Sequence, residues 1–189
     1  MRTRTLLLVL VSLGSLSAAS QAPKLLNVRD ARAVEETVAG KRSIANAARW
    51  GFNREDSTES LQAAINSGAK TLIVPFMGDP WIVRPLQLRS RQEIVLDPGV
   101  LILAKKGEYQ GGGDSLFTAV GQSNLVIRGY GATLRMHKRD YQNPPYTKAE
   151  WRMGIALRGC RQVLIEGLRV ESTGGDGFYV DGGGDLGWS

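Results

Sequence analysis

Short apolar triplets bounded by glycine or polar corners recur along the second half of the chain. Residues 117–129 align without a gap with residues 155–167, at an offset of 38 residues. The alignment places Leu125-Val126-Ile127 on Val163-Leu164-Ile165. Alternate residues of such triplets face one side of a strand, and no helical period of apolar residues accompanies them. The repeat therefore predicts short strands joined by corners.

Two further copies extend this repeat in both directions. At an offset of 31 residues upstream, Ile94-Val95-Leu96 match the first triplet, and residues 178–182 begin a copy 23 residues after Ile155. Constant strands with variable loops are typical of parallel strands that stack on one another along a solenoid. We therefore expect each copy to pair with the copies before and after it.

A helix is predicted immediately before the repeats, over residues 56–68. Asp56 and Glu59 have the spacing of a capping box, and Gly68 is a typical helix stop. The apolar residues that share one face of this helix are Leu61, Ala64 and Ile65. The first strand would otherwise expose an unpaired edge, so we expect the helix to cover that end.

Together these features resemble the pectin lyase-like superfamily. Residues 56–75, DSTESLQAAINSGAKTLIVP, are similar to the N-terminal segment of that fold, and residues 160–173, followed by 176–180, are similar to its repeats. The resemblance implies an all-β fold, a right-handed parallel β-helix (solenoid) with an N-terminal capping α-helix. No apolar triplet follows residues 184–189, so the chain is expected to be the N-terminal part of such a domain, truncated at its C-terminus. The superfamily includes lyases, hydrolases, epimerases, phage tailspikes and adhesins, so fold alone leaves the function open.

The chain is expected to divide into three parts. Residues 1–22 combine two arginines, an apolar stretch too short to span a bilayer, and small residues suited to cleavage. They predict a signal peptide, with an uncleaved anchor as the alternative, and hence a secreted, periplasmic or cell-surface protein. Residues 23–49 are a leader of uncertain structure that could hold a helix. Residues 50–189 form the repeat domain.

The charge balance narrows the class of partner. The formal net charge of +6 mildly favours anionic ligands such as an acidic polysaccharide, although ordinary solubility would require no such partner. No block of lysines and arginines alternates with stacking aromatics, so no nucleic acid is expected. No membrane contact is expected after cleavage of the signal peptide. The single cysteine, Cys160, excludes an intrachain disulfide and is interpreted as a packing residue.

A loop over residues 137–150 concentrates side chains that could bind a glycan. Cations pair with the carboxylates of a uronate chain, and aromatic rings stack on sugar rings. The alternative is a solvated loop whose shape is set by Pro144-Pro145. The predicted substrate-binding residues are His137, Lys138, Arg139, Tyr141, Tyr146 and Trp151.

Asp176 is the candidate catalytic residue. Asp176-Gly177 resembles the end of the Asn-Thr-Asp-Gly segment of polygalacturonase-like glycosidases, in which the aspartate is one of the catalytic carboxylates. Gly174 and Gly175 stand where that family has asparagine and threonine. Glycoside hydrolysis needs a second carboxylate across the scissile bond. The alternative is a turn, since Asp-Gly is a common corner dipeptide.

The same region suggests a calcium site. Pectate lyases, which share the resembled fold, hold Ca²⁺ with acidic residues, and Ca²⁺ prefers six or more oxygen ligands. The candidate ligands are Asp176, Asp181 and Asp185. A lyase also needs a basic residue as its proton acceptor, for which Arg158, Arg161 and Arg169 are candidates.

The sequence thus predicts an exported carbohydrate-active protein that binds or cleaves an acidic polysaccharide. If it is an enzyme, it is a pectate lyase-like polysaccharide lyase or a polygalacturonase-like glycoside hydrolase. The alternatives are a noncatalytic glycan-binding or structural module, or an inactive fragment.

Overall fold

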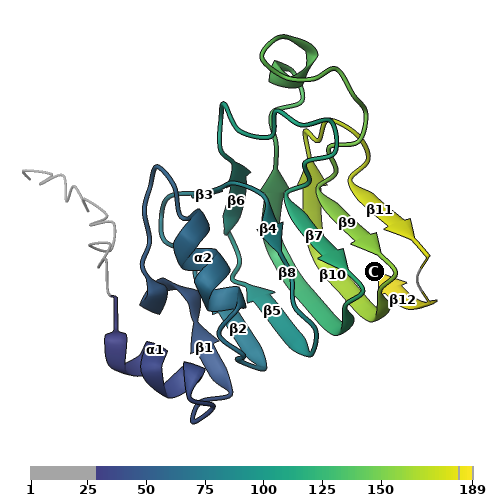
Figure 1. The fold of residues 1–189 in the computed structure, drawn as a ribbon. Helices are drawn as coiled ribbons and strands as arrows, with labels where there is room; N and C mark the ends of the chain where they lie inside the picture. The colour runs from purple at the N-terminus through teal and green to yellow at the C-terminus, as the bar shows by residue number, and fades with distance from the viewer. Residues whose placement is uncertain (1–28, 183, 189) are drawn as a thin grey trace, which may run out of the picture.

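Parallel strands in two sheets dominate the computed structural model (Figure 1). It describes residues 29–182 with their side chains and the backbone of residues 184–188. The predicted signal peptide, residues 1–22, lies outside the described residues. Among those that are described, no helix has the length and apolar character needed to cross a membrane.

The larger sheet has eight strands and the smaller has four. The eight-stranded sheet contains β1 (Ile44–Asn46), β2 (Thr71–Val74), β3 (Trp81–Val83), β5 (Gln92–Leu96), β6 (Leu101–Ala104), β8 (Ser123–Arg135), β10 (Arg161–Glu171) and β12 (Gly184–Trp188). The four-stranded sheet contains β4 (Leu86–Gln87), β7 (Phe117–Val120), β9 (Ile155–Arg158) and β11 (Phe178–Asp181). Neighbouring strands are parallel in both sheets.

Strand register follows the sequence repeat closely. Ile127 of β8 is opposite Ile165 of β10, which confirms the offset of 38 residues. Phe178 is opposite Ile155, as the fourth copy predicts. The upstream copy is shifted, because Ile94 lies opposite Ile127 and not opposite Leu125. A shift of two residues keeps every side chain on its expected face, so the apolar pattern alone could not exclude it.

The predicted class, an all-β right-handed parallel β-helix or solenoid, is wrong. Helices α1 (Ala31–Val38) and α2 (Thr58–Ile65), with the short 3-10 helices η1 (Ala47–Trp50) and η2 (Asp140–Gln142), accompany the two parallel sheets. The fold is a mixed α/β arrangement with few helices. A repeat of apolar triplets specifies parallel pairing and register, but it does not specify the path of the chain between the sheets.

Helix α2 forms where a helix was expected, but its N-terminus differs from the predicted capping box. Ser57 is the N-cap residue, and the Asp56 carboxylate accepts a hydrogen bond from the Thr58 amide at 2.9 Å. The Glu59 side chain is 94% exposed and points to Arg84, with its carboxylate oxygen 3.7 Å from Arg84 Nη2. The spacing of Asp56 and Glu59 therefore predicted where the helix starts, but not which groups the two carboxylates contact.

Helix α2 covers the free edge of the four-stranded sheet. The side-chain amide of Gln62 donates to the carbonyl of Gln87 at 2.9 Å and accepts from the Gln87 amide at 2.8 Å. These two bonds satisfy backbone groups of β4 that no further strand pairs. Figure 1 shows α1 and α2 at the side of the molecule where the first strands, β1 and β2, lie.

One hydrophobic core joins the two sheets. Ile94, Ile127 and Ile165, which lie in register on three neighbouring strands, are 1%, 0% and 3% exposed. Phe117 and Ile155 of the smaller sheet belong to the same cluster. The larger sheet begins earlier than the sequence suggested, because β1 pairs with β2 from within the segment predicted as a leader.

Candidate functional site

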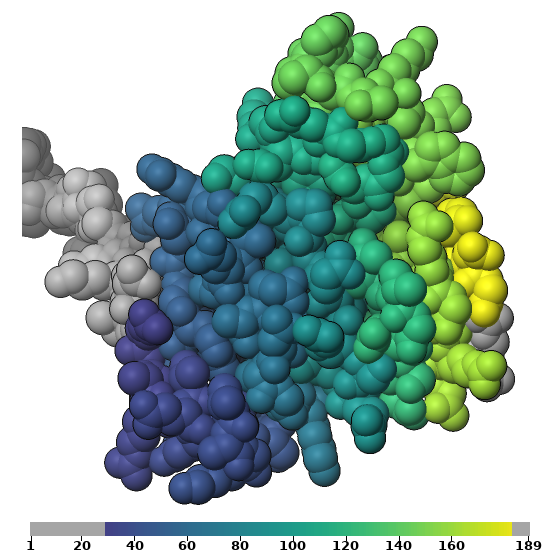
Figure 2. Space-filling model, viewed as in Figure 1, coloured from purple at the N-terminus to yellow at the C-terminus, as the bar shows by residue number. Residues whose placement is uncertain are grey.

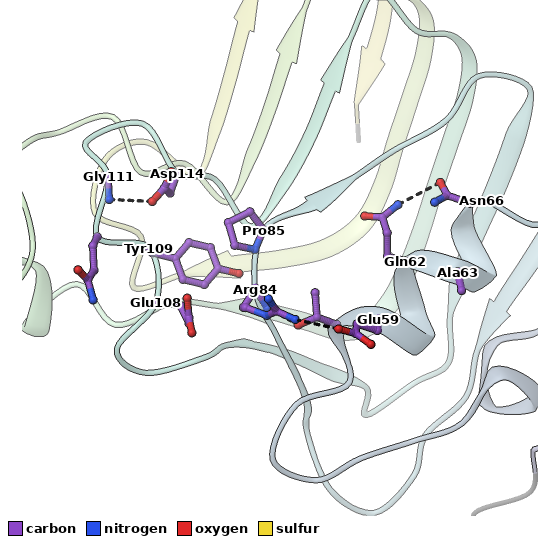
Figure 3. Close-up of a pocket in the computed structure, with 12 residues that line it drawn as sticks. Glu59, Gln62, Ala63, Asn66, Arg84, Pro85, Glu108, Tyr109, Gly111 and Asp114 are labelled. Carbon is purple, nitrogen blue, oxygen red and sulfur yellow. Dashed lines mark hydrogen bonds and ion pairs between the residues drawn. The ribbon is translucent and has the colours of Figure 1, made fainter.

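A cleft of about 930 Å³ lies between α2 and residues 108–114 (Figure 3). Glu59, Gln62 and Asn66 project from α2 on one side, while Glu108 and Asp114 lie across from them. Arg84 and Pro85 stand between the two walls. Sequence reasoning did not select this cleft, because its two walls are about fifty residues apart in the chain.

Three carboxylates line this cleft, those of Glu59, Glu108 and Asp114. Asp114 Oδ2 accepts a hydrogen bond from the Gly111 amide at 2.8 Å, which holds the carboxylate on its loop. Among the described residues, the carboxylate of Glu59 has only the long contact to Arg84. Carboxylates on opposite walls are the groups that acid–base cleavage of a glycosidic bond requires.

An ion cluster at Asp56 holds the N-terminal end of α2 next to the cleft. Asp56 Oδ2 lies 2.8 Å from Lys105 Nζ and 3.3 Å from Arg84 Nε. Burial favours a higher pKa for Asp56, but hydrogen bonds from Lys105 and Thr58 outweigh burial and lower the pKa to about 2. The cluster connects α2 to the start of the loop that forms the other wall.

Two long loops, residues 105–115 and 137–150, are joined by the buried side chain of Arg152. Arg152 is 0% exposed. Its Nε donates to the carbonyl of Tyr109 at 2.7 Å, and its Nη2 donates to the carbonyl of Thr147 at 2.7 Å. Figure 2 shows the two loops side by side, in teal and green, on the upper surface. The sequence did not identify this arginine, because the carbonyls that bind its side chain and allow its burial belong to residues distant in the chain.

Tyr141 and Tyr146 contribute their rings to the enclosure of Arg152. The guanidinium carbon lies 5.0 Å from the Tyr141 ring centroid and 5.8 Å from that of Tyr146. The two rings meet edge to face at 5.0 Å. Tyr141 is 1% exposed, and its burial raises the pKa of the phenol to about 12. Its ring is therefore enclosed by protein and is not available to stack on a sugar.

The three basic residues that open the loop have different surroundings. His137 is half-buried, and its Nε2 lies 2.7 Å from the carbonyl of Ala104 at the end of β6. Lys138 and Arg139 are exposed, and within the described residues neither forms an ion pair. The structure therefore places only Lys138 and Arg139 of this trio on the open surface.

Trp151 lies in a second group of exposed side chains. Its ring is 57% exposed and meets Tyr179 of β11 edge to face, with the centroids 6.2 Å apart. The guanidinium of Arg158, on the neighbouring strand β9, lies 5.0 Å from the Tyr179 centroid. We call Trp151, Tyr179 and Arg158 the aromatic platform. Of the six predicted substrate-binding residues, only Trp151 belongs to it.

Asp176 is exposed and stands in the turn before β11. Its backbone amide contacts Met153 Sδ at 3.1 Å, and its carbonyl accepts from the Gly154 amide at 3.4 Å. Asp181 is exposed at the end of β11, and the side chain of Asp185 lies outside the described part. Within the described side chains, no three histidine, cysteine, aspartate or glutamate residues form a group that could hold a metal ion.

The glycines before Asp176 are explained by packing. A Cβ on Gly175 would lie 2.1 Å from the carbonyl oxygen of Glu150, and one on Gly174 would lie 2.8 Å from the Tyr141 ring. Neither position has room for a side chain, Gly174 because of Tyr141 and Arg152 and Gly175 because of the Glu150 backbone. The departure from the Asn-Thr-Asp-Gly segment therefore follows from local packing, and at Gly174 from the enclosed arginine.

Comparisons with known proteins identify relatives without a described activity. No family model matches the chain. It is 26% identical to the uncharacterized protein YclG of Bacillus subtilis (strain 168) over 155 residues, covering 72% of this chain and 26% of that protein. It is 28% identical to the SPbeta prophage-derived uncharacterized protein YorA of the same strain over 104 residues, covering 54% of this chain and 17% of that protein. The chain thus spans about a quarter or less of these relatives.

A solved structure shares the fold. It is that of a provisionally assigned glycosyl hydrolase from Parabacteroides merdae ATCC 43184, with a TM-score of 0.61 and 17% sequence identity. The match covers 76% of this chain and 72% of that protein. At this identity the similarity shows a common fold.

Proposed function

We propose that this protein is carbohydrate-active and binds an acidic polysaccharide on the aromatic platform. The observation that carries the proposal is the exposed ring of Trp151 beside Tyr179, with the Arg158 guanidinium over the Tyr179 ring. An exposed indole gives a flat apolar face for the C–H groups of a sugar ring. A nearby guanidinium gives two parallel donors for a sugar carboxylate.

The charges around the platform agree with an anionic ligand. Arg158 forms no ion pair within the described residues, so its donors remain available to a uronate carboxylate. The cation–aromatic contact holds the guanidinium over the Tyr179 ring, which the Trp151 ring also contacts. The name given to the structural neighbour, a glycosyl hydrolase, supports a role with carbohydrates for this fold.

Substitution of the platform residues tests the proposal. Trp151→Ala should weaken binding of an oligogalacturonate by about tenfold or more, measured by isothermal titration calorimetry, because a stacking face is lost. Arg158→Gln should weaken binding of the acidic oligosaccharide while leaving any binding of a neutral one unchanged. Phe76→Ala is the matched control, since Phe76 is also an exposed aromatic at 56%. Equal affinity of Trp151→Ala and wild type would exclude the platform.

A second candidate function is hydrolysis in the cleft of Figure 3. The observation that favours it is the set of carboxylates on facing walls, with Glu59 opposite Glu108 and Asp114. Glu59→Gln and Asp114→Asn should each lower the release of reducing sugar ends from a sensitive polysaccharide by about a hundredfold if they act as acid and base across the cleft. Glu55→Gln, an exposed acid that does not line the cleft, is the control. Undiminished release by both cleft variants would rule out this reaction at this position.

A further inference from the structure

A separate cavity of about 580 Å³ lies at the C-terminal end of α2, beside the corner between β4 and β5. Lys70, Arg89 and Arg91 line it, and the described residues that line it include no carboxylate. None of the three cations forms an ion pair within the described part of the chain. The cavity shares no lining residue with the aromatic platform. It is therefore an uncompensated positive site.

Hydrogen bonds in the cavity wall leave most of the cationic donors unused. Arg89 Nε donates to the Asn66 side-chain oxygen at 2.8 Å, which orients the guanidinium. The remaining N–H groups of the guanidinium stay available to a ligand. Lys70 and Arg91 are both exposed. The oxygens of a ligand could accept hydrogen bonds from Lys70 next to β2, from Arg91 next to β5, and from Arg89 in the corner between β4 and β5.

Gln92 reduces the repulsion that the end of α2 would exert on an anion, because it donates to the last carbonyl of the helix. The C-terminus of a helix carries partial negative charge on its free carbonyls. Gln92, which is 3% exposed and lines the cavity, donates its amide hydrogens to the carbonyls of Ile65 at 3.1 Å and Ala69 at 3.0 Å. Its own oxygen, Oε1, is buried and has no hydrogen-bond partner among the described residues. The Gln92 amide thus binds two carbonyls beside three cations.

The backbone at Arg91 is a second, independent observation. Arg91 has a φ of 59°, in the left-handed region that asparagine adopts more readily than arginine. The next strand along, β8, has Asn124 at the matching position, because Gln92 and Leu125 are opposite each other. Asn124 has a φ of 57° in the same conformation. The corner therefore holds a cation where a neutral residue would fit the backbone better.

We propose that this cavity binds an oxyanion, a carboxylate or a sulfate group. Lys70, Arg89 and Arg91 pair with the oxyanion. A sugar acid and a sugar sulfate both carry this chemistry. The site is independent of the aromatic platform, and its ligand need not be a polymer.

Arg91→Asn is the decisive variant because it removes the cation and suits the backbone at once. Binding of sodium galacturonate and of sodium sulfate to the full chain is measured by calorimetry at low, constant chloride. Arg91→Asn and Lys70→Gln should each lower the affinity for the anion by about tenfold, since each removes a charge-assisted hydrogen bond. Lys41→Gln makes the same change of charge at an exposed site outside the cavity and should bind like wild type. Thermal melting should show that Arg91→Asn is at least as stable as wild type.

The two anions identify the source of the ligand group. Binding of galacturonate alone supports a carboxylate site, and binding of sulfate alone supports a sulfate-ester site. Absence of binding of both anions to wild type, or equal affinities for Arg91→Asn and Lys41→Gln, would overturn the proposal. Trp151→Ala separates this inference from the proposed function: it should leave galacturonate binding in the cavity unchanged even if the platform binds no glycan.

Discussion

At the scale of single residues, Arg152 explains more of this structure than any residue selected from the sequence. Its guanidinium lies beside the rings of Tyr141 and Tyr146 and donates to carbonyls of two different loops. A buried cation costs free energy unless its donors are satisfied, so the loops must keep their carbonyls in place. The same packing excludes a side chain at position 174.

Arg152→Met should lower the free energy of unfolding by about 1–3 kcal/mol, because the buried carbonyl of Tyr109 and the carbonyl of Thr147 lose their donor. Chemical denaturation measures this loss, and limited proteolysis should show faster cleavage in residues 137–150. Arg139→Met, at an exposed position of the same loop, is the control and should change stability little. A variant as stable and as resistant to protease as wild type would contradict this role.

Tyr141 should make stability depend on alkaline pH. Its pKa is raised from about 10 in the unfolded chain to about 12 in the folded protein. Because the folded state favours the neutral phenol, the contribution is fully present below pH 10 and is lost as pH rises through 12. Denaturation between pH 9 and 12 should show a steeper loss for wild type than for Tyr141→Phe. Parallel curves for the two proteins would argue against a buried phenol.

At the scale of elements, α2 forms one wall of the cleft and covers the edge of the smaller sheet. The Asp56 carboxylate accepts from Thr58 at the start of α2 and pairs with Lys105, which is 49 residues away. The sequence spacing of Asp56 and Glu59 predicted a local capping box. The fold also places Lys105 against this carboxylate, and the spacing of residues in the sequence could not reveal that contact.

Asp56 should stabilise the protein at neutral pH more than in acid. Its folded pKa of about 2 lies below the value of about 4 expected in the unfolded chain. The stabilisation is present above the unfolded value and is lost as pH falls through about 2. Asp56→Asn should cost about 1–2 kcal/mol at pH 7 and progressively less towards pH 2. Thermal melting across this range measures it, with the exposed Glu55→Gln as a control; a constant difference at all pH values would disagree with this assignment.

At the scale of the whole molecule, β8 is the strand on which the larger sheet depends. Its 13 residues pair with β5 and β6 on one side and with β10 on the other. By contrast, β1 pairs only with β2 within the described residues. Amides in strands with partners on both sides open only in larger unfolding events, whereas edge strands fray locally.

Hydrogen exchange should therefore be slowest in peptides covering residues 125–127 and faster in peptides covering residues 44–46. Mass spectrometry of exchange under native conditions measures both regions in one experiment. Ile127→Ala, which empties a site that is 0% exposed, should speed exchange throughout both sheets, with a cost of about 2–5 kcal/mol. Val126→Ala, at the half-buried neighbouring position, should have a smaller effect. Equal protection of β1 and β8 would mean that the sheet does not open from this edge.

The amino-acid sequence by itself determined the pairing of β8 with β10 and of β9 with β11, although not the register of β5 on β8. Alternating apolar triplets must face a common interior, so the pairs Ile127–Ile165 and Phe178–Ile155 follow from the repeat alone. The location of α2 also followed from local signals. These features depend on neighbouring residues and on a short period, which a sequence displays directly.

Only the tertiary structure decided the fold class and the composition of the sites. It enclosed Tyr141 around Arg152, brought Trp151 next to Tyr179, and set Glu59 across from Asp114. It also placed Lys70 with Arg91 around the buried Gln92 amide. These groups come from segments that are distant in sequence. Their proximity depends on where each loop and corner crosses the sheets, and no local pattern of residues encodes that path.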